Sequence, residues 1–204
     1  MDELLNEHEQ GERVRAWLQK NALGLIGGIA LGLALIFGWN WWKQQQASQR
    51  ENLAAQYDQF NQALATNPDQ AAKLLGGKLA GTVYAAVGAL DLAKVQVDAG
   101  KEPAALATLQ AAKTDDPALA EVIRQRTAEL LVANGKAEDA VRLLGKPTQP
   151  GALEVLGDAE VKLGKPVEAR ASYRHALRLL EEGSPERQVV ELKLADIGGN
   201  TDTP

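Results

Sequence analysis

The feature that most constrains this chain is an apolar run from Ala22 to Trp42. Lys20 and Lys43 flank the run, and no charged residue lies between them. At about 1.5 Å of rise per residue, a helix of roughly 20 residues matches the ~30 Å hydrocarbon core of a bilayer. The sequence therefore predicts a membrane-spanning helix over residues 22–42.

A cleaved signal peptide is the main alternative for this run. Its apolar core would be shorter, about 7–15 residues, and small residues would follow at the cleavage site. Here the run ends in Trp39, Asn40, Trp41 and Trp42, bulky groups that suit the headgroup layer of a membrane. A buried helix of a soluble protein is disfavoured too, because the rest of the chain has no comparably apolar element to surround it. We therefore favour an uncleaved anchor.

Flanking positive charge gives an orientation for this helix. Arg13, Arg15 and Lys20 precede it, and Lys43 and Arg50 follow it. By the positive-inside rule this excess favours a cytoplasmic N-terminus. The larger, C-terminal part of the chain would then lie on the other side of the membrane. The chain contains no cysteine, which is compatible with the bacterial periplasm and excludes a disulfide framework.

Within the apolar run, Gly24, Gly28 and Gly32 recur at every fourth residue. They would share one face of the helix, and such a row of small residues lets a second membrane helix approach closely. The pattern predicts a packing face for another copy of the chain or for a different protein. Glycine is also frequent in membrane helices in general, so the ordinary composition of such helices remains an alternative explanation.

The rest of the chain predicts an all-α fold. We expect a cytoplasmic arm at residues 1–21, with its polar first ten residues poorly ordered, the membrane helix, a helical domain at residues 43–197 and a disordered tail at residues 198–204. The membrane helix should continue through a Gln-rich segment until Asn67 and Pro68 stop it. Alanine, leucine and regular breakers indicate eight further helices, which we place at residues 68–75, 82–99, 103–112, 117–133, 137–144, 151–163, 166–182 and 185–197.

These helices form repeating pairs. A Gly-Lys pair recurs at Gly100, Gly135 and Gly164, at intervals of 35 and 29 residues. Counted from these glycines, equivalent positions hold similar residues: seven before are Ala93, Ala128 and Gly157; five after are Ala105, Ala140 and Ala169; nine after are Leu109, Leu144 and Tyr173; twelve after are Ala112, Pro147 and Ala176.

The steric reason is that two antiparallel helices approach closely only where small side chains meet, while larger groups fill the space toward the next pair. The pattern resembles that of tetratricopeptide repeats. It departs from them at Pro147, at the missing proline seventeen residues after Gly135, and in the shortened last interval. We expect three repeats between about residues 82 and 182, a degenerate repeat before them, and a capping helix from Pro185. Chance alanine richness is the alternative.

Taken together, the acidic arm, the span with its tryptophan-rich exit, the Gln-rich helix with Tyr57 and the weak repeats resemble the YfgM family of bacterial inner-membrane proteins. The resemblance covers nearly the whole chain. It implies a single-pass inner-membrane protein whose tetratricopeptide-like α-solenoid faces the periplasm. It also implies a non-enzymatic role as an ancillary subunit of the SecYEG translocon, beside a PpiD-like chaperone, in passing translocating polypeptides to periplasmic chaperones.

The residues argue against catalysis and nucleic-acid binding. Of the two histidines, His8 lies in the arm, and His175 lies on a predicted helix with basic neighbours. Phosphate loops, nucleophile elbows and metal-spaced histidines are absent from the sequence, so we expect no cofactor, no metal and no small-molecule substrate. Asp115 and Asp116 suit the N-terminal cap of the helix at Pro117. Residues 44–204 hold 22 acids against 18 Lys and Arg, which does not suit nucleic acid.

Protein binding is the function class that remains. In tetratricopeptide stacks the first helix of each pair lines the inner curve, at positions ten and six residues before each repeat glycine. By that resemblance the partner-binding groove comprises Leu90, Lys94, Gln125, Glu129, Glu154 and Asp158, with Lys162 one turn further. A mixed, partly acidic groove suits variable or unfolded segments better than one fixed anionic tail. Ordinary solvated helix faces are the alternative for each residue.

Two functions stay open at this point. The first is an accessory protein of the Sec translocon that hands over secreted chains. The second is a membrane-anchored scaffold for another envelope assembly, such as pilus or division machinery. The sequence does not discriminate between them.

Overall fold

The computed structural model describes residues 2–199, and the side chains from residue 11 onward. Over the described residues, all regular elements are α-helices and no strand is present, which confirms the all-α prediction. The chain divides into two units, Met1–Ala54 and Ala55–Pro204.

Helix α1 (Asp2–Thr66) runs through the predicted membrane span and beyond it. Among the described residues it is the one helix long and apolar enough to cross a membrane. Our expectation that the first ten residues lack order is wrong for residues 2–10, which belong to α1. The physical reason is that Glu, Gln and Leu are good helix formers and that acidic side chains interact favourably with the helix N-terminus.

A first hairpin joins the end of α1 to α2 (Pro68–Gly76). Asn67 stops α1 and caps α2, because its Oδ1 accepts a hydrogen bond from the backbone N–H of Gln70 at 3.2 Å. Pro68 occupies the first helical position, which tolerates a missing N–H. Phe60, Ala71, Leu75 and Leu79 are buried together with residues of the following helix, residues 83–98, so this degenerate hairpin shares its core with the next hairpin.

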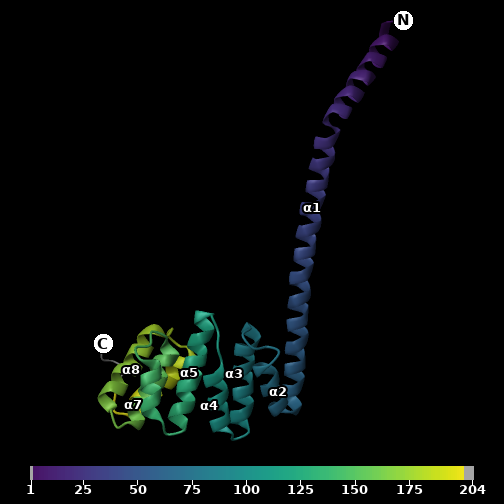
Figure 1. Ribbon diagram of the computed structural model, residues 1–204. Coiled ribbons are helices and arrows are strands. Elements are labelled where there is room, and N and C mark those ends of the chain that lie inside the picture. Colours follow the sequence, from purple (N-terminus) through teal and green to yellow (C-terminus); the bar gives the residue numbers. More distant parts are fainter. Residues whose placement is uncertain (1, 200–204) are drawn as a thin grey trace. The chain divides into compact units, whose positions relative to one another are not determined.

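Three further hairpins follow, and the second unit stacks them side by side (Figure 1). They are α3 (Val83–Asp98) with α4 (Glu102–Ala111), α5 (Pro117–Ala133) with α6 (Ala137–Leu144), and α7 (Pro150–Lys162) with α8 (Pro166–Leu179). A final helix, α9 (Pro185–Asp196), packs on the last hairpin, where Val190 and Leu194 are fully buried. The expected three repeats, preceding hairpin and capping helix are therefore all present.

The Gly-Lys pairs explain how each hairpin turns. Gly100, Gly135 and Gly164 have φ values of 68°, 73° and 69°, the left-handed region that favours glycine. The N–H of the following lysine donates to a carbonyl five residues back, for example from Lys101 to Gln96 at 2.8 Å. This is the Schellman motif that ends a helix.

The same motif ends α9. Gly198 has φ 71°, and the N–H of Gly199 donates to the carbonyl of Leu194 at 2.8 Å. The first two residues of the expected disordered tail therefore cap a helix. Residues 200–204 lie outside the described part of the chain.

The small and large positions of the repeat form the core. All three residues seven before the repeat glycines and all three five after them are buried, as are Leu109, Leu144 and Tyr173. In the first of these hairpins, Ala93, Ala105 and Leu109 belong to one buried cluster, so the small residues and the larger one pack together. The burial of these positions agrees with the steric interpretation of the repeat.

The departures from the repeat have a simple cause. Helix α6 has eight residues and ends at Leu144, so Pro147 lies in the loop after it and breaks no helix. Helix α7 has 13 residues, whereas α5 has 17. The interval between Gly135 and Gly164 is short because α6 and α7, which lie within it, are shorter than α4 and α5 of the preceding interval.

Candidate partner-binding groove

A groove of about 580 Å³ lies between α3 and α5. These are the first helices of two neighbouring hairpins, and we call the face that such first helices form the inner face of the stack. Aliphatic side chains form much of its lining: Leu90 and Val97 come from α3, and Val122 and Leu130 from α5. Val97 is 37% exposed and Val122 is 44% exposed. The groove therefore offers apolar surface to a partner.

Charges at the rim of this groove balance. Its lining includes Asp91, Lys94, Arg126 and Glu129, two acids and two bases. The Lys94 ammonium lies 2.6 Å from a carboxylate oxygen of Asp98, and Arg126 Nη1 lies 2.8 Å from Glu129 Oε2. Because two acids and two bases line this rim, their charges sum to zero and the rim selects weakly for the charge of a partner.

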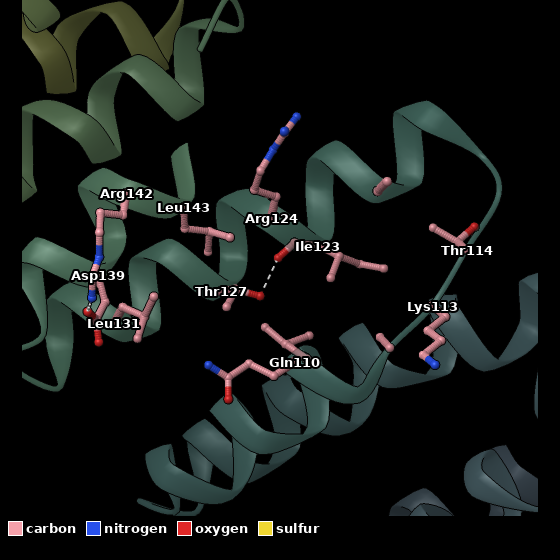
Figure 2. Close-up of a pocket in the computed structure, with 13 residues that line it drawn as sticks. Gln110, Lys113, Thr114, Ile123, Arg124, Thr127, Leu131, Asp139, Arg142 and Leu143 are labelled. Carbon is pink, nitrogen blue, oxygen red and sulfur yellow. Dashed lines mark hydrogen bonds and ion pairs between the residues drawn. The ribbon is translucent and has the colours of Figure 1, made fainter. Parts of the chain in front are cut away.

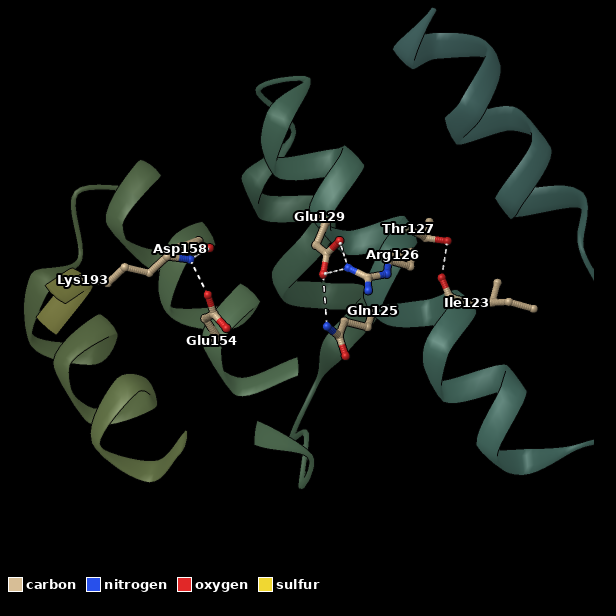
Figure 3. A network of polar contacts seen from close by, with 8 residues as sticks. All are labelled: Ile123, Gln125, Arg126, Thr127, Glu129, Glu154, Asp158 and Lys193. Atoms are coloured by element: carbon tan, nitrogen blue, oxygen red, sulfur yellow. Dashed lines mark hydrogen bonds and ion pairs between the residues drawn. The ribbon is translucent and has the colours of Figure 1, made fainter. Parts of the chain in front are cut away.

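Gln125 of α5 contacts one of the residues that line the groove (Figure 3). Gln125 Nε2 donates to Glu129 Oε1 at 3.0 Å. The same side chain covers Gly151 at the start of α7, where an added Cβ would lie 2.7 Å from Gln125 Nε2. Gln125 therefore lies between Glu129 and the first turn of α7.

Beyond Gln125, the acidic positions are occupied by the chain itself (Figure 3). The Lys193 ammonium of α9 lies 2.6 Å from Glu154 Oε1 and 2.7 Å from Asp158 Oδ2. Burial lowers the pKa of Lys193, but the hydrogen bonds to Asp158 and Glu154 outweigh it and leave this pKa above its ordinary value. Lys193 is therefore held in its charged form.

Tyr173 completes this cluster. Its hydroxyl donates to Asp158 Oδ1 at 2.7 Å. Burial, followed by the bond and the charge of Asp158, raises the pKa of Tyr173 well above its ordinary range. A nearby pair joins a hydroxyl to a carboxylate without a basic partner: Ser172 donates to Glu160 Oε2 at 2.7 Å. Burial raises the pKa of Glu160 by more than this hydrogen bond lowers it.

The seven residues assigned to the groove thus divide. Leu90, Lys94 and Glu129 line the open groove, whereas Gln125 does not line it but contacts Glu129. Glu154 and Asp158 lie together but hold Lys193, and Lys162 is exposed in the last turn of α7. Sequence reasoning missed Val97, Val122 and Arg126. The sequence does contain a signal for Val97, because a valine lies three residues before each repeat glycine.

Tyr57, near the end of α1, contacts the rim of the groove. Its hydroxyl donates to Asp91 Oδ2 at 3.3 Å, and its ring lies 5.1 Å from that of Tyr84 between centroids. Burial, with smaller effects of Asp91, raises the pKa of Tyr57. The last turns of α1 are thus fixed directly against α3.

The glycine face of the apolar helix is open. A Cβ atom added at Gly24, Gly28 or Gly32 would meet no heavy atom within 4 Å. Near the end of the run, the rings of Trp39 and Trp42 lie 5.2 Å apart, and Lys43 Nζ lies 5.8 Å from the Trp39 ring. This arrangement suits a membrane interface.

The described residues contain no group of three or more His, Asp or Glu side chains placed to hold a metal ion. What they do contain is a stack of helical hairpins with an apolar inner groove, preceded by a candidate membrane helix. These features define an all-α helical-repeat protein with a candidate membrane helix.

Residues 15–199 match the family model of the tetratricopeptide repeat-like domain, and the chain belongs to this family. A protein of Haemophilus influenzae named ancillary SecYEG translocon subunit is 27% identical, over 95% of this chain and 98% of that protein. A protein of the same name from Escherichia coli is 28% identical, over 85% and 88%. Another from Aggregatibacter actinomycetemcomitans is 24% identical, over 95% and 98%. The resemblance stated from the sequence is confirmed.

Proposed function

We propose that this protein is a membrane-anchored accessory subunit of the Sec translocon that binds translocated polypeptides in its inner groove. The observation that carries the proposal is the groove between α3 and α5. Its aliphatic lining and charge-balanced rim suit unfolded segments, which expose apolar side chains and vary in charge. The names of the three relatives supply the translocon as its setting.

The proposal includes a topology and a handover. Residues 22–42 cross the inner membrane, the N-terminus is cytoplasmic, and the helical domain lies in the periplasm. Bound segments pass from the groove to periplasmic chaperones, among them a PpiD-like partner. Affinity differences between related complexes arise mainly in dissociation rates. A weakly bound segment therefore leaves the groove quickly, which favours its transfer to a chaperone.

Site-specific crosslinking tests where a client binds. A photoreactive residue is placed at Val122, in the groove, and in a matched control at Leu192 of α9. Leu192 is 68% exposed and does not line the groove. In membranes holding an arrested translocation intermediate, we expect the Val122 probe to capture the translocating chain and the Leu192 probe to capture much less. Equal capture at both positions, or capture at neither, would contradict the proposed groove.

A second experiment tests whether the protein associates with the translocon. Gly28→Leu would block the open glycine face, whereas Gly27→Leu changes the adjacent residue, which points in another direction on the helix. We expect Gly28→Leu to reduce recovery of translocon subunits in mild detergent and Gly27→Leu to have a smaller effect. Recovery of pilus or division proteins alone, from either the natural chain or the control, would favour the scaffold function instead.

A further inference from the structure

The outer face of the stack carries a second surface, separate from the inner groove. A groove of about 530 Å³ lies beside α2, α3 and α4, and another of about 630 Å³ lies among α4, α5 and α6. The two share Ala112 and Lys113 and therefore adjoin. We propose that this outer trough, defined by these two grooves, docks an acidic amphipathic helix of a partner protein.

The shape of the first groove suits a helix. Ala72, Ala85, Ala89, Ala107 and Ala111 contribute to its lining, and Lys113 is the single charged residue among its lining residues. Small side chains allow two helix axes to come close, because the distance between axes depends on the residues at the contact. An apolar helix face therefore fits along this groove better than an irregular loop with unpaired backbone groups.

The floor of the second groove is apolar as well (Figure 2). Ile123, Thr127 and Leu131 are buried along α5. The Thr127 hydroxyl donates to the Ile123 carbonyl at 2.7 Å, so it needs no further partner. Leu143 of α6, 39% exposed, adds apolar surface to one wall. Aliphatic side chains of a docked helix would be desolvated here.

The charge of the trough selects the partner. Lys113, Arg124 and Arg142 belong to its lining, against one carboxylate, Asp139. Figure 2 places Lys113 at one end of the opening and Arg142 with Asp139 at the other. The whole chain has a formal net charge of −5, and the inner groove is balanced, so a basic rim distinguishes this surface from both.

Part of this positive charge is already shared. Arg142 pairs with Asp139, and Arg124 pairs with Glu121 of the preceding turn. The pair of Arg142 with Asp139 is exposed to solvent, where a single ion pair contributes little. The Glu121 side chain is only 22% exposed, so we count Arg124 as neutralised by it. No hydrogen bond or ion pair engages the Lys113 side chain within the described residues. Acidic side chains at both ends of a docked helix would therefore find Lys113 and Arg142 accessible.

Binding of a defined probe tests this inference. The probe is a synthetic helical peptide with one Leu/Ala face and one Glu face, labelled with fluorescein; its matched control replaces each Glu with Lys. Anisotropy is measured with the full chain in phosphatidylcholine nanodiscs. We expect the acidic peptide to bind at least about tenfold more tightly than the basic one and to weaken with added salt.

Variants locate the binding. Lys113→Glu with Arg142→Glu should weaken binding of the acidic peptide at least about tenfold. Leu143→Asp should also weaken this binding, with Lys113 and Arg142 left in place. The control, Lys94→Glu with Lys162→Glu, changes two exposed lysines of the inner face and should stay within about twofold. Circular dichroism confirms that all variants fold. Equal affinity for the two peptides, an unchanged affinity of the outer variants, or an equal loss in the control would overturn the inference.

The inference does not depend on the proposed function. Clients of the inner groove and the helix of the outer trough contact different residues, so loss of one activity leaves the other measurable. Failure of the peptide experiment would leave the crosslinking result at Val122 untouched, and the converse also holds.

Discussion

Tyr173 of α8 lies so close to Gly157 of α7 that a Cβ atom at Gly157 would be 2.4 Å from Tyr173 Cε1. The two preceding hairpins hold alanine and leucine at the same two positions. The last hairpin therefore keeps about the same combined side-chain volume at these two positions, but the tyrosine supplies nearly all of it. Tyr173 gains a hydroxyl that reaches Asp158 at 2.7 Å.

This pair predicts a coupled effect of two substitutions. Gly157→Ala alone should lower the free energy of unfolding by about 1–3 kcal/mol, because the tyrosine has no room to move without losing its bond to Asp158. In a Tyr173→Leu background the same change should be neutral or stabilising by up to about 1 kcal/mol, since alanine is the better helix former. Urea unfolding followed by circular dichroism measures both. Additive effects would contradict the proposed contact.

Alkaline pH is expected to destabilise the end of the stack. The pKa values of Lys193 and Tyr173 are both raised in the folded state, so their protonated forms favour folding. Their contribution is complete below the unfolded pKa values of about 10 and is lost as pH rises through the folded values. We expect the urea midpoint to fall above about pH 10.

The matched variant for this pH effect is Lys193→Met with Tyr173→Phe. It keeps most of the buried volume and removes both titrating groups, so its midpoint should fall less over the same alkaline range. A parallel fall in both proteins would assign the pH effect to other groups.

Asp116 and Asp115 should differ in their effects on stability. Asp116 Oδ1 accepts hydrogen bonds from the N–H groups of Ala118 and Leu119, at 2.8 and 3.0 Å, so it is the cap expected from the sequence. Asp116→Ala should cost about 0.5–2 kcal/mol. Asp115→Ala, at the adjacent exposed residue, should stay within about 0.5 kcal/mol. Thermal unfolding of the two variants decides; equal losses would refute the assignment of the cap.

A glycine at a repeat turn should tolerate substitution poorly. Gly135 has φ 73°, and an L-residue there costs roughly 1–2 kcal/mol. We expect Gly135→Ala to lower the thermal midpoint and Gly135→Asn to lower it less, because asparagine enters the left-handed region more readily. The control is Gly76→Ala, which lies within α2 with nothing near its Cβ position. A Gly135→Ala protein as stable as the control would contradict this reading of the turn.

Much of the fold was predictable because its signals are local. Prolines 117 and 166 mark helix starts that the structure reproduces, since proline is tolerated only in the first turn. The glycine register located the hairpin turns for the same reason. The arm was misjudged because its polarity suggested disorder, whereas its residues are also good helix formers.

The candidate site was only partly predictable because it depends on contacts between distant residues. Counting from the repeat glycines located Leu90, Lys94 and Glu129 at the groove. It gave no indication that Lys193, 39 residues after Glu154 and 35 after Asp158, would occupy the acidic positions. It also missed Val122, whose exposure depends on the space left between two hairpins.

The sequence by itself determined an apolar helix of membrane length and the register of the helical hairpins, because periodicity, small residues and turn glycines act within a few residues of each other. The tertiary structure alone decided which inner positions stay open, which are held by α9, and where the outer face is hollowed and basic. These properties depend on how whole helices pack, and packing brings together side chains that no local pattern relates.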